Sequence, residues 1–260
     1  MIIEAKNLKF SYTDEKPLFH NVNLSVDKGE ILAILGANGA GKSTLLNCLA
    51  NLLKPQEGEI RIHGELMEHM PLRKIAKCIG YVPQNHTPAY GYQVRDFIVM
   101  GRAPYLNTFQ QPGKKDYELT DQIMEELHIT HLAYRSYLEL SGGERQQVTI
   151  ARAMVQQPDL IMLDEPTNHL DYGNQLRMIQ TIKRLARHHF GIIITSHMPD
   201  HVLMLDGKVG ILDDEGNFQI GSCQEMMQED RLRHLYHVDI HLVYEPSVNR
   251  VVCFSGEKKS

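Results

Sequence analysis

The stretch Gly36-Ala37-Asn38-Gly39-Ala40-Gly41-Lys42-Ser43 follows a continuous apolar run, Ile31–Leu35, and precedes a predicted helix from about Lys42 to Leu53. An uninterrupted apolar run is typical of a strand buried on both faces. The glycines allow the backbone to wrap an anion with its N–H groups pointing inward, and the helix N-terminus adds a favourable dipole. Because the motif lies between a strand and a helix, it indicates a phosphate-binding loop rather than a turn that binds nothing. The sequence therefore predicts an α/β fold of the P-loop NTPase type.

The polar groups of this loop have expected partners on a nucleotide. Lys42 should reach the β- and γ-phosphates, and the Ser43 hydroxyl should bind Mg²⁺. The nucleotide-binding residues predicted from the loop are Gly36, Ala37, Asn38, Gly39, Ala40, Gly41, Lys42, Ser43 and Thr44.

A second apolar strand ends in two carboxylates, in the segment Leu160-Ile161-Met162-Leu163-Asp164-Glu165. By itself an acidic strand end is usually a helix cap or a solvated turn. Here the phosphate loop needs an acidic partner for its Mg²⁺, and Asp164 fits that role. Glu165, its neighbour, is placed where a carboxylate could polarise an attacking water. The two motifs together favour a site that hydrolyses a nucleotide.

A third motif, Leu140-Ser141-Gly142-Gly143-Glu144-Arg145-Gln146, lies between the loop and the acidic strand. Ser141 is a good N-cap residue, and Glu144 three positions later could complete a capping box. A capping box does not explain two successive glycines, which weaken the start of a helix. Glycines there make sense if the backbone must approach a phosphate closely. Because the first loop already surrounds one nucleotide, we expect a head-to-tail dimer with ATP sandwiched at each of two interfaces.

These motifs resemble those of the ATP-binding subunit of an ABC transporter, and the resemblance covers nearly all of the chain. Gly36–Ser43 resembles the Walker A motif, Leu160–Glu165 the Walker B motif, and Leu140–Gln146 the family signature. The resemblance implies ATP and Mg²⁺ as ligands and a homodimer of subunits. It also implies that the signature of one subunit contacts the γ-phosphate held by the other. The signature residues concerned are Ser141, Gly142, Gly143, Glu144 and Gln146.

Further motifs occur in the family order. The resemblance implies that Tyr12 stacks on adenine and that Gln84 senses Mg²⁺ and couples to the membrane subunit. It implies that Asp171, in the loop 168–171, crosses the dimer interface, and that His197 contacts the γ-phosphate. The implied catalytic residues are Glu165, His197 and Gln84, and the implied Mg²⁺ set is Ser43, Gln84 and Asp164.

Each of these residues has a plainer interpretation when taken alone. Tyr12 could be a strand aromatic, Gln84 a surface amide and His197 a buried histidine; only their joint order favours function. Two positions depart from the usual pattern. Arg145 is a common variant within the signature. Met198 follows His197 where Asp is more usual, which leaves the local hydrogen bonding open.

The order of patterns predicts the domain organisation. Ile2–Tyr12 and Leu18–Val26 broadly alternate apolar and polar residues around a turn at 13–17, which predicts an N-terminal antiparallel β subdomain. Helical periodicity replaces strand patterns from about 88 to 157, as in an inserted α-helical subdomain. We expect an ATPase domain over 1–239. A terminal hairpin and tail, 240–260, should follow it.

The segment Val94–Pro104 is similar to importers that take up iron–siderophore complexes, haem, cobalamin or molybdate. That likeness implies two copies of a polytopic permease as partners and, indirectly, a periplasmic or surface substrate-binding protein. It also implies attachment to the cytoplasmic face of the membrane through the permease. Phe97, Ile98 and Met100 could equally form the core of the subdomain, whereas 101–104 is a stiff, charged turn suited to docking.

Composition excludes several other classes of protein. The formal net charge of −5 argues against a nucleic-acid protein. No run approaches the ~18 apolar residues of a membrane helix, and the N-terminus lacks the pattern of a secretion signal. The four scattered cysteines are typical of free thiols in the cytoplasm. The alternatives are a soluble, non-transport ABC ATPase and an ABC exporter subunit. About a hundred residues without heptads separate Lys42 from Ser141, which disfavours the coiled-coil type of soluble ATPase.

Overall fold

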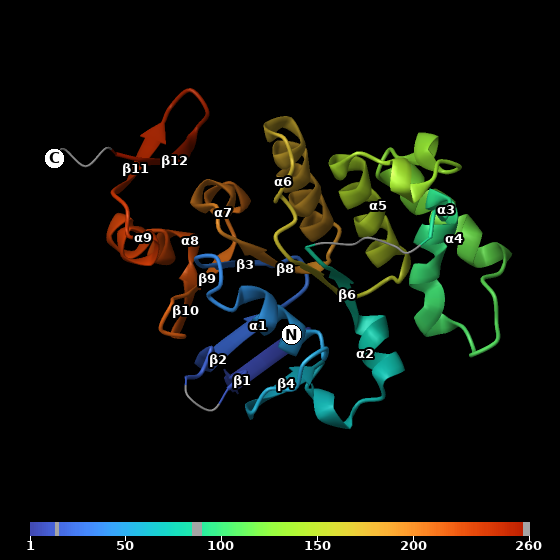
Figure 1. Ribbon diagram of the computed structural model, residues 1–260, viewed down its shortest axis with the longest axis horizontal. Helices are drawn as coiled ribbons and strands as arrows, with labels where there is room; N and C mark the ends of the chain where they lie inside the picture. Colours follow the sequence, from blue (N-terminus) through green and yellow to red (C-terminus); the bar gives the residue numbers. More distant parts are fainter. Residues whose placement is uncertain (14–15, 85–89, 257–260) are drawn as a thin grey trace.

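A computed structural model describes residues 1–13, 16–84 and 90–256 of the chain (Figure 1). Its central sheet has six strands in the order β10-β9-β3-β8-β7-β6. Neighbouring strands are parallel except at the edge, where β10 pairs antiparallel with β9. The strands are β3 (Ile31–Leu35), β6 (Ile79–Val82), β7 (Leu160–Leu163), β8 (Gly191–Ser196), β9 (Lys208–Leu212) and β10 (Phe218–Ser222). Every residue of β3, β7 and β8 is buried, as the continuous apolar runs predict.

A smaller antiparallel sheet forms the N-terminal part and confirms the predicted β subdomain. Its strand order is β2-β1-β4-β5. The strands are β1 (Ile3–Phe10), β2 (Phe19–Val26), β4 (Glu57–Ile62) and β5 (Glu65–Leu66). Helix α1 (Lys42–Leu49) packs its apolar side into one core shared with this sheet and with one face of the central sheet. The phosphate loop is thereby fixed between two layers.

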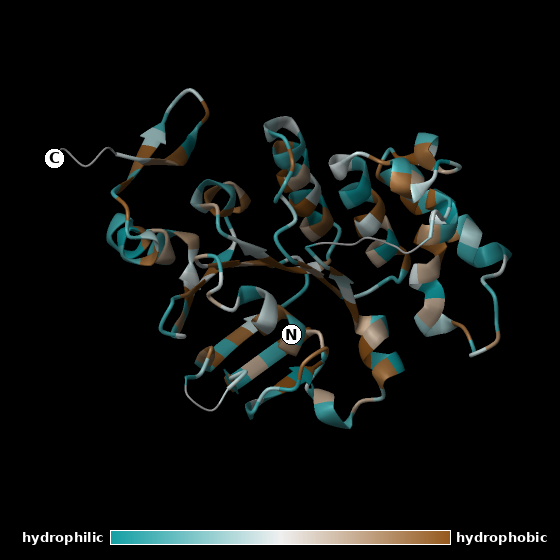
Figure 2. Cartoon of the chain, in the orientation of Figure 1, coloured by the Kyte–Doolittle hydropathy of each residue, from teal (hydrophilic) through white to brown (hydrophobic). Residues whose placement is uncertain are grey.

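Helices cover the other face of the central sheet and form a second core. In that core the rings of Phe97 and Tyr137 lie 4.3 Å apart between centroids. Strands of the central sheet are mostly brown in Figure 2, whereas the outer faces of the helices are largely teal. The helices of this part are α3 (Val94–Val99), α4 (Lys114–Glu126), α5 (Gly142–Val155), α6 (Tyr172–Arg187) and α7 (Pro199–Leu205). Short 3₁₀ helices lie at η1 (Met67–His69), η2 (Met100–Tyr105), η3 (Thr130–Leu132) and η4 (Tyr137–Glu139).

Some predicted boundaries are wrong. The helix expected to reach Leu53 ends at Leu49, and the strand expected to reach Tyr12 ends at Phe10. The single helix expected around 224–236 is two helices, α8 (Cys223–Met226) and α9 (Glu229–Tyr236). Met227 and Gln228 leave helical dihedral angles between them, and Met227 is buried. Helix α2 (Leu72–Cys78) and strands β9 and β10 were not predicted. Positions 14–15 of the predicted turn lie outside the described residues.

A two-stranded antiparallel hairpin ends the described chain, as predicted. Its strands are β11 (Ile240–Glu245) and β12 (Arg250–Ser255), and they lie beside α7 and α9 at one end of the molecule (Figure 1). Within the described ranges, no helix combines the length and the apolar character needed to cross a bilayer.

Candidate functional site

Four adjacent strands of the central sheet bring the predicted site residues to one edge. The phosphate loop follows β3, Gln84 follows β6, Asp164 and Glu165 follow β7, and His197 follows β8. Because these strands are parallel neighbours, the segments after them meet at their carboxyl ends. This edge is where open α/β sheets bind ligands.

The phosphate loop is tightly wound around the start of α1. Gly41 is the residue before the helix and has φ +100°, a left-handed conformation that side chains rarely adopt. A Cβ on Gly36 would lie 2.6 Å from the Leu212 carbonyl oxygen, so no larger residue fits there. The Lys42 ammonium, 4% exposed, donates to the carbonyl oxygens of Gly36 and Ala37, each at 2.9 Å. These backbone groups hold the lysine across the mouth of the loop.

The Ser43 hydroxyl joins the loop to the acidic strand end, and a hydroxyl from β8 supports the same carboxylate. The Ser43 hydroxyl donates to Asp164 Oδ1 at 3.0 Å, and the Thr195 hydroxyl donates to the same oxygen at 2.6 Å. The Glu165 backbone N–H in turn donates to the Thr195 hydroxyl at 2.9 Å. Asp164 and Ser43 thus offer adjacent oxygen ligands, the donor set that Mg²⁺ prefers.

The Glu165 carboxylate lies at the centre of a ring of donors. Lys42 Nζ is 3.2 Å from Glu165 Oε1, and Gln84 Nε2 donates to Oε2 at 3.0 Å. Asn168 Nδ2 also donates to Oε2, at 3.2 Å. Glu165 has φ +44°, a left-handed backbone that non-glycine residues rarely adopt. Strained conformations of this kind cluster at functional sites, where the surrounding contacts enforce them.

His197 approaches the same carboxylate without bonding to it. Its Nδ1 lies 3.3 Å from Glu165 Oε2, but the two groups are not aligned for a hydrogen bond. This buried nitrogen therefore has no hydrogen-bond partner among the residues that the structure describes. A buried polar group of this kind is expected to gain a partner when a ligand enters.

Tyr12 lies beside the loop rather than in a strand. Its hydroxyl is 3.0 Å from the Thr44 hydroxyl, and its ring meets the edge of Phe10 at 4.9 Å between centroids. The Tyr12 side chain is 69% exposed. An aromatic ring held at its edge and open to solvent suits stacking on a base.

The signature begins α5 with a capping box. Glu144 N donates to Ser141 Oγ at 3.3 Å, and Ser141 N donates to Glu144 Oε2 at 2.7 Å. The bond from the Ser141 backbone, assisted by Arg135 at 2.9 Å, lowers the pKa of Glu144. A Cβ on Gly143 would lie 2.9 Å from the Asn174 side chain, so this helix start packs closely on the start of α6. The signature therefore contains both the capping box and two glycines at the helix start.

Asp171 caps α6 beside the signature. Its Oδ1 accepts from Asn174 N at 2.9 Å, and its Oδ2 accepts from the Asn174 side chain. These bonds, that from the Asn174 backbone first, lower the pKa of Asp171. A Cβ on Gly142 would contact Leu170 at 3.8 Å. The signature and the loop after the acidic strand thus form one continuous surface.

The family comparison decides what this arrangement is. The family described as "ABC transporter" matches residues 19–168, more than half of the 260-residue chain. The chain belongs to this family. The match confirms the resemblance seen in the sequence, and with it the P-loop fold. ATP-binding subunits of this family bind and hydrolyse ATP.

Two curated relatives of this ABC subunit match nearly end to end. A molybdate import ATP-binding protein of Haemophilus influenzae is 36% identical over 91% of this chain and 88% of its own. A probable iron chelatin transport ATP-binding protein of Helicobacter pylori is 34% identical over 98% of this chain and 100% of its own. Among solved structures, an inward-facing metal-chelate type ABC transporter aligns with TM-score 0.88 and 33% identity, covering 99% of this chain and 98% of that one.

Sequence reasoning about this ABC subunit missed two residues of the site. Thr195 links Asp164 to the Glu165 backbone, and Asn168 contacts the Glu165 carboxylate. The signal for Thr195 was available, because it is a hydroxyl within the buried, otherwise apolar run from Ile192. Asn168 begins the loop 168–171 that the resemblance assigns to the dimer interface, but its contact with Glu165 had no signal of its own, since an amide after a strand usually belongs to a turn.

Less of the segment 94–104 is available for docking than the sequence suggests. Phe97 and Ile98 are buried in the helical core, whereas Met100 is open to solvent. Arg102 is internally paired: its Nε donates to Asp116 at 2.9 Å, and its guanidinium stacks on Tyr105 at 3.9 Å. The charge of Arg102 is therefore already paired within the subunit. A docking partner would meet the shape of the turn at 101–104 rather than an unpaired charge.

Proposed function

We propose that this chain is the ATP-hydrolysing subunit of an importer that takes up a metal chelate or a molybdate-type oxyanion through a partner permease. The supporting relatives are named for molybdate import and for iron chelatin transport, and the supporting structure is of the metal-chelate type. Siderophore iron, haem, cobalamin and molybdate remain the candidate cargoes, because this subunit is not expected to touch the cargo.

The observation that carries the assignment of ATP hydrolysis is the position of Glu165. Its carboxylate is 9% exposed and is surrounded by donors from the phosphate loop, from the segment after β6 and from its own loop. We assign Glu165 as the general base that takes a proton from the attacking water, with Gln84 and Asn168 orienting it. His197, whose Nδ1 has no hydrogen-bond partner among the described residues, is assigned to the γ-phosphate. Tyr12 is assigned to the base of the nucleotide.

The oxygen donors of the loop fit Mg²⁺. We assign Ser43 and Asp164 to it directly, with Gln84 as the third residue of the set. The ion, when bound, neutralises charge on the β- and γ-phosphates. Thr195 keeps the Asp164 carboxylate in place through its hydroxyl.

Completion of the site needs a second copy of the chain. The signature residues Ser141, Gly142, Gly143, Glu144 and Gln146 start α5, in the helical part rather than beside α1 (Figure 1). We propose a head-to-tail dimer in which the signature of one copy contacts the ATP held by the other. Asp171, on the same surface, lies at that interface. Closure of the dimer would move the two permease subunits, and hydrolysis would reset them.

We further propose the division into an ATPase domain over 1–239, with a helical subdomain inserted at about 88–157, and a hairpin and tail over 240–260. Position 88 lies outside the described residues. The subunit is assigned to the cytoplasmic face of the membrane, attached through two permease copies that face a substrate-binding protein.

Two experiments test the proposal. Glu165→Gln should bind ATP, form a stable dimer and hydrolyse ATP at least about a hundredfold more slowly, because the amide cannot accept the proton. A parental hydrolysis rate would exclude Glu165 as the base. Co-purification with a polytopic membrane protein, followed by cargo-dependent ATPase activity in liposomes, separates an importer from the soluble and exporter alternatives.

A further inference from the structure

The C-terminal hairpin is fastened to α7 by a two-pronged ion pair. Arg250 donates to Asp200 Oδ1 at 2.7 Å and to Asp200 Oδ2 at 3.0 Å. The Cys253 backbone N–H donates to the same Asp200 Oδ1 at 3.3 Å. The two side chains are about a third exposed, 29% for Arg250 and 30% for Asp200. Paired donors of this kind fix geometry as well as adding energy.

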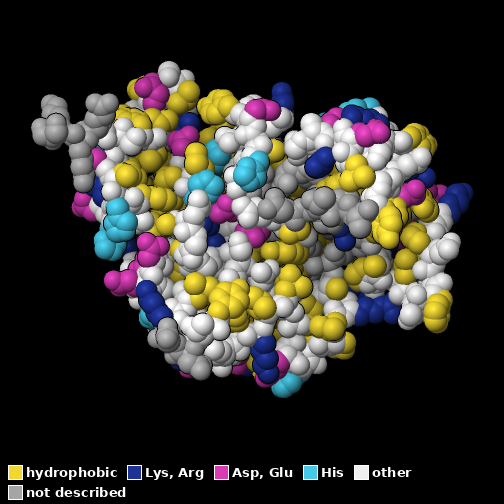
Figure 3. All heavy atoms as spheres, viewed as in Figure 1, with side chains coloured by type: hydrophobic (Ala, Val, Ile, Leu, Met, Phe, Trp, Pro, Cys, Tyr) yellow, Lys and Arg dark blue, Asp and Glu magenta, His cyan; other side chains and the backbone are white. Residues whose placement is uncertain are grey.

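The hairpin depends on its attachments for its position. An isolated two-stranded hairpin is marginally stable in water. A pocket of about 900 Å³ lies between the hairpin, α6, α7 and α8, lined in part by Leu242, Met204 and Lys183. Hydrophobic side chains also remain at the surface there (Figure 3), among them Val243 and Val248. Ile240, Leu242 and Cys253 pack the base of the hairpin against the helical core, and the Arg250–Asp200 pair adds a fixed point on α7.

Helix α7 directly follows the histidine assigned to the γ-phosphate. His197 is two residues before Pro199, the first residue of α7, and Asp200 is in the first turn. On another side of the helix, buried His201 Nδ1 is 3.1 Å from the Thr167 hydroxyl, in the segment after β7. The helix is thus held from the sheet by His201 and from the hairpin by Asp200. Both contacts lie within four residues of His197.

The same C-terminal part contains a buried phenol. The Tyr236 hydroxyl, at the end of α9, is buried and has no hydrogen-bond partner within the described part of the chain. Burial raises the pKa of Tyr236, and the charges of Cys253 and Glu165 raise it further. Helix α9 is joined to the hairpin, since Leu242 N donates to Glu229 Oε1 at 2.8 Å. Helix and hairpin therefore form one unit.

We propose that the C-terminal unit, residues 229–255, positions His197 by holding α7 through the Arg250–Asp200 pair. Arg250 is then a positioning residue for ATP hydrolysis, although it follows the assigned site by more than fifty residues. Met198 stands where Asp is more usual after the histidine, and the carboxylate that orients this segment comes instead from Asp200. The proposal rests on the γ-phosphate role proposed above for His197.

Substitutions at both ends of the pair test it. Arg250→Ala and Asp200→Asn should each lower kcat for ATP about threefold to tenfold, because His197 loses its fixed direction. KM for ATP should stay within about twofold, since the phosphate loop and Tyr12 are unchanged. The double variant Asp200→Arg with Arg250→Asp restores an opposite-charge pair and should recover kcat. Arg250→Lys, which keeps the charge but lacks the fork, should fall between Arg250→Ala and the parent.

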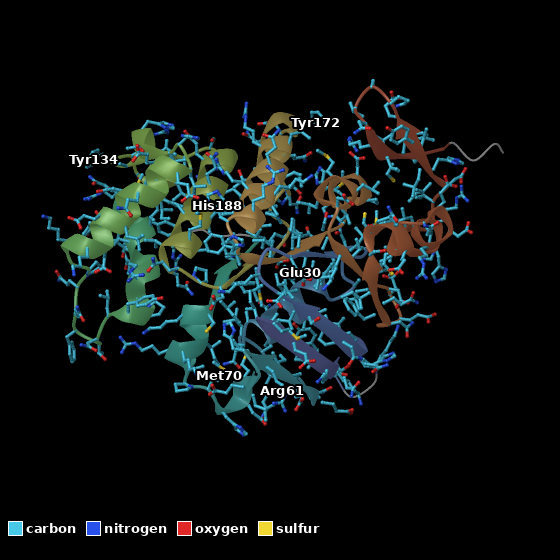
Figure 4. All side chains as sticks on the ribbon, turned by 180° about the vertical axis from the view of Figure 1, so that it is seen from behind. Glu30, Arg61, Met70, Tyr134, Tyr172 and His188 are labelled. Carbon is cyan, nitrogen blue, oxygen red and sulfur yellow. The ribbon has the colours of Figure 1, made fainter. Side chains whose placement is uncertain are left out.

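A matched control comes from the other end of the molecule. Arg61 makes a comparable fork to Glu59, at 2.9 and 3.1 Å, and is 33% exposed. It lies on the antiparallel sheet, far from the hairpin (Figure 4). Arg61→Ala should leave kcat and KM at parental values. Thermal unfolding should be measured for every variant, to check that each is folded at the assay temperature.

The outcomes separate this inference from the proposed function. Parental kcat for both Arg250→Ala and Asp200→Asn, together with loss of turnover in His197→Ala, overturns the positioning role alone. Parental turnover in His197→Ala overturns the role of the histidine itself. Failure of the charge-swapped pair to recover kcat, with Arg61→Ala impaired to the same degree, shows that these arginines act only through general stability and also overturns the inference.

Discussion

Lys42 and Glu165 form a buried ion pair across the site, with 3.2 Å between Nζ and Oε1 and side-chain exposures of 4% and 9%. The pair joins the residue assigned to the phosphates with the residue assigned as base. In this arrangement each neutralises the other in a region of low dielectric. A γ-phosphate entering the loop would compete with Glu165 for the ammonium and free the carboxylate to accept a proton. With the roles proposed above, the pair would couple nucleotide binding to activation of the base.

Lys42→Ala should abolish turnover and weaken ATP binding. The change removes the ammonium that the phosphates need, and it leaves the buried Glu165 carboxylate with only its amide donors. Breaking a buried pair in this way should also destabilise the fold, by about 3–5 kcal/mol. Nucleotide titration, steady-state hydrolysis and urea unfolding measure the three effects. Lys54→Ala, in the loop after α1, serves as the control. Unaltered ATPase activity in Lys42→Ala would contradict the assignment of the phosphate loop.

Thr195→Val should reduce hydrolysis although residue 195 is not in the family motifs used above. Valine has nearly the same shape, but it removes the donor to Asp164 and the acceptor for Glu165 N. Unsatisfied buried groups of this kind cost about 1–3 kcal/mol each. We expect a lower melting temperature and a raised requirement for Mg²⁺ in the ATPase assay. Thr195→Ser keeps the hydroxyl and should stay close to the parent. If both variants behave like the parent, the hydroxyl does not orient Asp164.

The phosphate loop, the acidic strand end and the signature were predictable because each carries its own local chemistry. Strands β3, β7 and β8 were predictable as well, since burial on both faces leaves a continuous apolar run. The pairing of these strands then brings the functional residues to one edge without further information. This part of the site follows from topology.

Other contacts could not be read from the chain. The Arg250–Asp200 pair joins residues fifty positions apart, and neither lies in a motif. The break between α8 and α9 has no Gly or Pro to announce it; it arises where buried Met227 leaves helical geometry. The burial of Phe97 and Ile98 likewise depends on how α3 packs against α5, which periodicity alone does not show.

The cap of the signature helix should make the free energy of unfolding depend on pH. Bonding to the Ser141 backbone holds the pKa of Glu144 below its ordinary value of 4.5. A carboxyl with a lowered folded-state pKa stabilises the protein fully above its unfolded pKa, and the contribution is lost as the pH falls through the lower folded value. The stability difference between the parent and Glu144→Gln should therefore be largest at pH 6–7 and shrink as the pH falls below about 4.5. Urea unfolding across this range measures it, and a difference independent of pH would contradict the assignment.

A mixture of two inactive variants tests the shared ATP site directly. Lys42→Ala has an intact signature, and Ser141→Arg has an intact phosphate loop but a bulky charge at the start of α5. Neither homodimer should hydrolyse ATP. In a head-to-tail heterodimer one of the two sites combines the intact loop with the intact signature, so mixing should restore up to about a quarter of parental turnover if sites act independently. If the sites act together, the mixture should still form ATP-dependent heterodimers that neither variant forms alone. The matched control pairs Lys42→Ala with Glu165→Gln, which leaves no competent site and should not recover turnover. A mixture that gains neither turnover nor ATP-dependent association would show that Ser141 does not serve the nucleotide of another copy.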